Sequence, residues 1–151
     1  MNVQLDAEIE IAADAATIFD TVNDAEGAPR IYAKHGPVPG VTELRYDGDG
    51  KPRLDAVRKV WTADGNVLEE KLVVYDRPRA HSYTLRGFAA PFSLLVREAR
   101  ADWRFEPIPG AVATRVHWTY TFTLTTALVW PLAALFLHTV FHGWMLGCLG
   151  R

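Results

Sequence analysis

Apolar and polar residues alternate along most of the chain from Val3 to Leu124, with interruptions by short runs of glycine, proline, aspartate and asparagine. Alternation with a period of two is typical of a β-strand that buries one face. It predicts strands at residues 3–12, 41–46, 53–62, 67–75, 81–88, 94–106 and 112–124. The turns between the last six of these segments are short, and short connections join antiparallel neighbours. We therefore expect a seven-stranded antiparallel sheet with a strong twist.

Three segments have a helical pattern instead. Asp14 is a suitable N-cap, and apolar residues at helical spacing follow it, which predicts a short helix over 15–22. Residues 23–34 offer a second short helix. The segment 126–150 is too long for a strand and predicts a long C-terminal helix, the only element long enough to cover the apolar face of the sheet. The expected fold class is α+β, in a single domain over 1–151.

Composition narrows the classes of function. The chain has 16 Lys+Arg against 18 Asp+Glu and a formal net charge of -2, which argues against a polybasic nucleic-acid binder, so no nucleic-acid partner is expected. Its single cysteine, Cys148, excludes an intrachain disulfide and a cysteine zinc cluster. The acidic, alternating N-terminus does not resemble a secretory signal. These features predict a cytoplasmic protein.

The distribution of charge is uneven. No Asp, Glu, Lys or Arg occurs from Val116 to Gly150. At 1.5 Å per residue, residues 127–149 are long enough to cross a bilayer. A helix packed on its own sheet is the preferred interpretation. A homodimer or a membrane-surface contact through residues 127–150 stays open. The protein is therefore predicted to be cytoplasmic, or peripheral to the membrane.

Alternation also predicts which residues face the helix. The inward-facing apolar residues are Leu44, Tyr46, Leu72, Tyr83, Trp103, Phe105, Trp118 and Tyr120 on the strands, with Phe136 and Val140 on the helix. Glu70 and Arg97 fall on the same face, and the ambiguous strand 53–62 adds Arg58 if Ala56 points inward. Because a buried charge is costly unless paired, Glu70 is expected to pair with Arg58 or Arg97. Such a pair is either a polar anchor for a ligand or a sheet-end position whose side chains reach water.

Metal and cofactor motifs are weak. His138 and His142 have the spacing of two metal ligands on one helix face, but no Glu follows His138 and no third ligand is evident. The sequence also lacks a P-loop, a dinucleotide fingerprint and a Ser-His-Asp order. We expect neither a metal nor a cofactor.

Three segments together resemble the SRPBCC superfamily of START-like, helix-grip proteins, and within it the polyketide cyclase/dehydrase and lipid-transport branch. They are IEIAADAATIFDTVNDAE at 9–26, EKLVVYDRPRAHSYTL at 70–85 and GAVATRVHWTYTF at 110–122. The resemblance covers essentially the whole chain. It implies a curved seven-stranded antiparallel sheet around a long C-terminal helix, with a cavity for a hydrophobic ligand between them.

The expected function is to bind or transport a hydrophobic small molecule, such as a lipid, an isoprenoid or a polyketide-like aromatic, in that cavity. The inward-facing residues named above would line it. The first alternative is an aromatase/cyclase-type enzyme in which Glu70, Arg97, Tyr83 or a histidine exchanges protons. The second is a module that docks on a membrane or a partner through its apolar C-terminal helix. The sequence alone leaves open whether the protein is an enzyme.

Overall fold

The computed structural model describes residues 2–24, 31–32, 40–48, 51–88, 92–126, 131, 134–135 and 137–149. Its strands are β1 (Asn2–Ile11), β2 (Val41–Tyr46), β3 (Val57–Thr62), β4 (Val67–Asp76), β5 (Ala80–Arg86), β6 (Val96–Pro107) and β7 (Thr114–Leu124). Its helices are α1 (Ala15–Asn23), a short 3-10 helix (Phe92–Leu94), a π-helical turn (Leu137–Phe141) and α4 (His142–Leu149).

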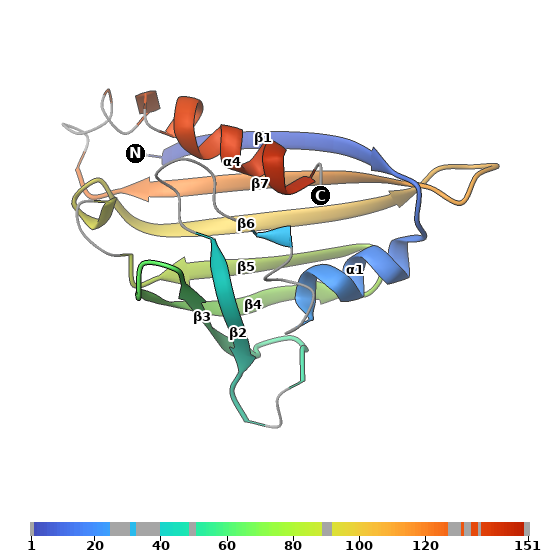
Figure 1. Ribbon diagram of the computed structural model, residues 1–151, viewed down its shortest axis with the longest axis horizontal. Coiled ribbons are helices and arrows are strands. Elements are labelled where there is room, and N and C mark those ends of the chain that lie inside the picture. Colours follow the sequence, from blue (N-terminus) through green and yellow to red (C-terminus); the bar gives the residue numbers. More distant parts are fainter. Residues whose placement is uncertain are drawn as a thin grey trace.

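The strands form one seven-stranded antiparallel sheet in the order β1-β7-β6-β5-β4-β3-β2, as predicted (Figure 1). Strands β2 to β7 follow each other as a meander, and β1 joins the far edge beside β7. The β1–β7 register pairs Val3 with Phe122 and Ile11 with Thr114. The third strand is shorter than expected: Asp55 adopts a left-handed conformation, with φ of 66°, and β3 begins only at Val57.

A β-bulge reverses the predicted orientation of one side chain. The register of β6 against β7 shifts between Val96 and Glu98. A bulge adds a residue and so reverses the alternation on one side of it. As a result Val96 is buried and Arg97 is exposed, and the prediction that Arg97 faces the concave side was wrong.

Helix α1 begins where the sequence predicts. The backbone N–H of Thr17 donates to the Asp14 carboxylate at 2.7 Å, which satisfies one of the free amides of the first turn. Ile18, Phe19 and Val22 are buried toward the sheet. Most of the predicted second short helix at 23–34 lies outside the described residues.

The C-terminal segment packs against the β1 and β7 side of the concave face (Figure 1). Nε2 of His142 lies 2.6 Å from the carbonyl oxygen of Asp6 on β1, and the ring of Trp144 lies edge-on to that of Trp118 at 5.5 Å. Within the predicted long helix, residues 137–141 form the π-helical turn and α4 follows it directly. Among the described residues, no helix has the length and apolar character needed to cross a bilayer. The predicted homodimer or membrane-surface contact through 127–150 stays a prediction.

Candidate functional site

Two charged side chains are buried together on the concave face. Arg58 on β3 and Glu70 on β4 occupy directly opposed positions in the ladder. Nε of Arg58 donates to Oε2 of Glu70 at 2.6 Å, and the two side chains are 1% and 7% exposed. Burial raises the pKa of Glu70, and the Arg58 guanidinium opposes that shift. The predicted pairing of Glu70 with Arg58 is confirmed, and burial excludes a position at the sheet end where both side chains reach water.

Further polar groups complete the surroundings of Arg58. Its Nη1 donates to the hydroxyl of Tyr46 at 2.8 Å and to Oδ1 of Asn23 at 3.2 Å. The Tyr46 hydroxyl in turn donates to the backbone oxygen of Asn23 at 2.8 Å. The ring of Tyr83 lies 4.7 Å from the guanidinium carbon, within the range of a cation–π contact. Residues of β2, β4, β5 and the end of α1 together therefore hold the Arg58 guanidinium in place.

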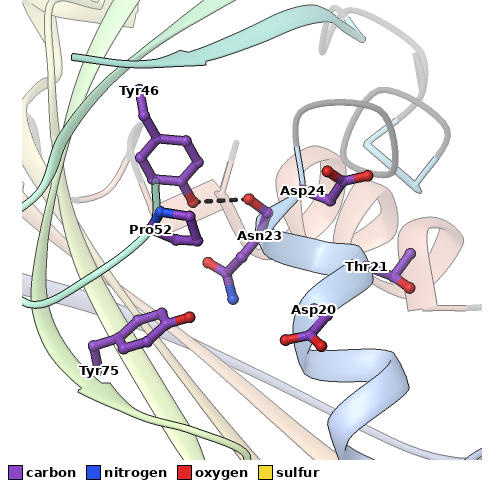
Figure 2. A pocket seen from close by; sticks show the side chains of 7 residues that line it. All are labelled: Asp20, Thr21, Asn23, Asp24, Tyr46, Pro52 and Tyr75. Carbon is purple, nitrogen blue, oxygen red and sulfur yellow. Dashed lines mark hydrogen bonds between the residues drawn. The ribbon is translucent and has the colours of Figure 1, made fainter. Parts of the chain in front are cut away.

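A pocket of about 340 Å³ opens beside this network, between the end of α1 and strands β2 and β4 (Figure 2). It is lined by Asp20, Thr21, Asn23, Asp24, Tyr46, Pro52 and Tyr75. Because Tyr46 and Asn23 both line the pocket and hold Arg58, the buried ion pair braces its inner wall.

The rim of the pocket carries a second ion pair. Arg77 donates to both carboxylate oxygens of Asp20, at 2.8 and 2.7 Å. The hydrogen bond from Arg77 holds the pKa of Asp20 below its ordinary value. Both side chains are about half exposed, so this pair orients the rim and adds little to stability.

A row of rings runs from the pocket across the sheet. In the cross-strand register, Tyr75 is opposite His81, His81 is opposite Trp103, and Trp103 is opposite Trp118. His81 stacks on Trp103 at 5.7 Å, and the two tryptophans stack at 4.4 Å. Tyr32 lies edge-on to both tryptophans. The concave face is thus an aromatic surface that extends from Tyr75 to the C-terminal helix.

Burial controls the ionisation of this surface. It lowers the pKa of His81 well below its ordinary value, and the charge of Arg58 adds to the effect. It raises the pKa of Tyr83 to about 12 and that of Tyr120 well above its ordinary value. At neutral pH the imidazole is therefore uncharged and both phenols keep their protons.

The predicted inward-facing residues of the strands, apart from Arg97, are buried on this face. They are Leu44, Tyr46, Arg58, Glu70, Leu72, Tyr83, Trp103, Phe105, Trp118 and Tyr120. Tyr46 also lines the described pocket. Val140 is half-buried at the margin of the core, and Phe136 lies outside the described residues.

Three residues of the site were missed. The alternation that places Tyr83 inward also places His81 inward, so that signal was present in the sequence. Asn23 and Tyr32 fall in a segment predicted only as helix, where no local pattern indicates which side chains reach the sheet. In the part of the chain that is described, no group of three or more His, Cys, Asp or Glu is arranged to hold a metal ion.

A curved antiparallel sheet with a C-terminal helix on its concave face is the helix-grip α+β fold. The chain belongs to the polyketide cyclase/dehydrase and lipid transport family, whose model matches residues 2–148. The resemblance seen in the sequence is therefore confirmed. A search of curated proteins finds no relative by sequence.

Solved structures share the fold at low sequence identity. The Zhui aromatase/cyclase of a Streptomyces species superposes with a TM-score of 0.73 at 15% identity, over 99% of this chain and 90% of that one. Norcoclaurine synthase from Thalictrum flavum gives 0.69 at 15% identity, over 99% and 90%. The di-domain aromatase/cyclase BexL gives 0.69 at 21% identity, over 99% of this chain and 48% of that one. At these identities the likeness concerns the fold.

Proposed function

We propose that the protein binds a hydrophobic small molecule with a ring-shaped body, which enters the pocket between α1 and strands β2 and β4. The observation that carries the proposal is the pocket itself, at about 340 Å³, with an inner wall braced by a buried ion pair. Ligand sites are typically concave, roughly 300–1,000 Å³ in volume, and combine apolar walls with a few fixed polar groups. Tyr46, Pro52 and Tyr75 supply such walls here.

The polar wall supports an orienting role. A tyrosine hydroxyl has one hydrogen and two lone pairs. Tyr46 donates its hydrogen to the Asn23 carbonyl and accepts one hydrogen bond from Arg58, so one lone pair is left for a ligand hydroxyl. Because Arg58 and Asn23 hold Tyr46 in place, little side-chain entropy is lost when the ligand binds.

The expected affinity is modest. A ring system the size of an aromatic side chain buries roughly 150–250 Å², which is worth about 4–6 kcal/mol at about 25 cal/mol per Å². The entropy lost on association offsets part of this gain, and one or two oriented hydrogen bonds add to it. Dissociation constants on the order of 10 μM to 1 mM are therefore expected for a simple ring compound.

The test measures the affinity of the wild type and of two variants for naphthol by isothermal titration calorimetry. Pro52→Trp fills the pocket and is expected to weaken binding about tenfold or more. Leu54→Trp introduces the same side chain two residues away, at an exposed position outside the pocket, and is expected to bind like the wild type. Equal affinity for the wild type and Pro52→Trp would show that this pocket is not the entrance.

A second function, an aromatase/cyclase-type enzyme, is favoured by one specific observation. Protonated Tyr83 and neutral His81 lie side by side on the concave face, their rings stacked at 5.8 Å, near the fixed charge of Arg58. An imidazole can accept a proton and a phenol can donate one, as cyclisation with loss of water requires. The lowered pKa of His81 makes it a weak base and the raised pKa of Tyr83 makes it a weak acid at neutral pH, so this function is the second candidate. Arg97 is excluded from this role because it is exposed.

Turnover separates the two functions. The protein is incubated with a β-diketone that can cyclise to an aromatic ring, and the product is analysed by mass spectrometry. If the protein is an enzyme, the mass of the product shows the loss of water. Tyr83→Phe would then lower the rate of product formation and leave ligand affinity within about threefold. If the compound binds measurably but is recovered unchanged, the protein is a ligand binder and not a cyclase for this compound.

A further inference from the structure

The side chain of His81 is enclosed between the sheet and helix α1. It is 0% exposed, and neither ring nitrogen has a hydrogen-bond partner in the part of the chain that is described. The imidazole stacks on the rings of Trp103 and Phe105, at 5.7 Å each, and both rings belong to β6 of the sheet. From α1, the ring of Phe19 meets the imidazole edge-on at 5.3 Å. Phe19 is therefore the side chain by which α1 covers His81.

The surroundings of His81 offer nothing that would stabilise a positive charge. A protonated imidazole has two N–H donors, and a buried charge is costly unless it is paired. The ionisable groups on the elements around it are Arg58 of β3, Glu70 and Tyr75 of β4, Tyr83 of β5 and Asp20 of α1. Both carboxylates are already paired, Glu70 with Arg58 and Asp20 with Arg77. Burial raises the pKa of both phenols, which therefore stay neutral, and β6 adds only uncharged rings on this face.

Helix α1 is a small element that depends on its contacts with the sheet. It has nine residues, and a helix of that length is not stable alone in water. At its start the hydroxyl of Thr114 donates to the carbonyl oxygen of Ala13 at 2.8 Å, and at its end Oδ1 of Asn23 accepts from Arg58 at 3.2 Å. Small elements of this kind open at a lower free energy than the strands of a sheet core. Opening of α1 is thus the smallest movement that exposes His81 to water.

We infer that α1 is a proton-sensitive cover, which leaves the sheet when His81 takes up a proton and becomes accessible to water. The same helix supplies one wall of the pocket, through Asp20, Thr21 and Asn23. Its departure dismantles that wall, so acid favours release of a bound ligand. The opening itself follows from the contact between Phe19 and His81, whereas the release of a ligand rests on the proposed function.

The pH range follows from the two states of His81. Burial lowers its pKa well below the ordinary value in the closed form, and once α1 has opened the imidazole titrates near its ordinary pKa of about 6.5. The closed form therefore keeps its full stability above that pH and loses it as the pH falls. The equilibrium constant for opening should change little from pH 8 to pH 7 and rise about eightfold from pH 6 to pH 5.

The test is hydrogen–deuterium exchange from pH 5 to pH 8, corrected for the intrinsic pH dependence of amide exchange, with α1 compared to β6 and β7. In the wild type, protection of α1 should be lower than that of these strands and should fall about eightfold from pH 6 to pH 5. His81→Phe keeps a ring and removes the proton acceptor, so its α1 protection should not depend on pH. His117→Phe makes the same substitution on the convex face of β7 and should keep the fall. Phe19→Leu covers His81 less completely and should lower α1 protection at every pH.

Three results would overturn the cover: α1 protection that does not vary with pH in the wild type, the same variation in His81→Phe, or unchanged protection in Phe19→Leu. Exchange of α1 only together with β6 and β7 would overturn it as well, because His81 would then be reached by unfolding of the whole protein. An excess of naphthol should raise α1 protection at pH 5, since a ligand stabilises the form that binds it. If naphthol changes nothing while the pH dependence holds, the cover stands and the proposed binding function fails.

Discussion

Removing one partner of the Arg58–Glu70 pair at a time should destabilise the protein more than removing both. Arg58→Met removes the cation and leaves the Glu70 carboxylate 7% exposed without a counter-charge. Glu70→Leu does the converse and leaves the guanidinium with Tyr46 and Asn23 as its neutral hydrogen-bond partners. Both changes keep much of the side-chain volume. The remaining charge, rather than a cavity, therefore dominates the expected loss.

The magnitude follows from the burial of the pair. Removing one partner of a buried, hydrogen-bonded ion pair typically costs about 3–5 kcal/mol, because it leaves an uncompensated charge in a medium of low polarity. For a chain of this length, each kcal/mol lowers the melting temperature by about 2–4 °C, so each single variant should melt roughly 6–20 °C below the wild type. The double variant buries no charge and should lie closer to the wild type than either single variant.

Urea unfolding followed by tryptophan fluorescence measures these free energies. Arg79→Met is the control, because Arg79 pairs with Asp76 at the surface, with side chains 75% and 52% exposed, and its loss should cost no more than about 1 kcal/mol. A loss from Arg58→Met as small as that from Arg79→Met would contradict an uncompensated buried charge. Two single losses that simply add in the double variant would contradict it as well.

Two further predictions concern His81 and the start of α1. Because burial depresses the pKa of His81, the imidazole binds a proton below about pH 6.5 in the unfolded chain but not in the folded protein. The free energy of unfolding is therefore undiminished above that pH and falls below it by up to about 1.4 kcal/mol per pH unit. His81→Phe should remove this slope and be at least as stable as the wild type at pH 7, as thermal melts from pH 5 to 8 would show; an unchanged slope would contradict the burial of a neutral imidazole. Asp14→Ala removes the N-cap of α1 and should cost about 0.5–2 kcal/mol in urea unfolding, whereas Asp14→Ser should retain most of that stability.

The architecture was largely predictable because its signals are local. Period-two alternation located each strand, and Asp14 marked the start of α1. Two departures have local backbone causes: the left-handed conformation of Asp55 shortens β3, and the bulge between Val96 and Glu98 turns Arg97 outward. A bulge leaves no compositional mark in this segment, so alternation continued through it predicts the wrong face for one residue.

The candidate site was predictable only where it lies on strands. Glu70 and Arg58 were found because a charge on an apolar face conflicts with the pattern. Asn23 lies at the end of α1 and Tyr32 lies outside the strands, and no local pattern in the sequence indicates their contacts with the sheet.

The place of β1 has a consequence for how the chain folds. Its partner is β7, so β1, the first strand of the sheet to be synthesised, can pair only after residues 114–124 have been synthesised. Pairing between such distant segments is slow, and the apolar residues Val3 and Leu5 stay available to other nascent chains in the meantime. Asp6, Glu8 and Glu10 alternate with the apolar positions, and such charges discourage edge-to-edge association. We therefore expect the acidic face of β1 to protect the strand during biosynthesis as well as to solvate it in the folded protein.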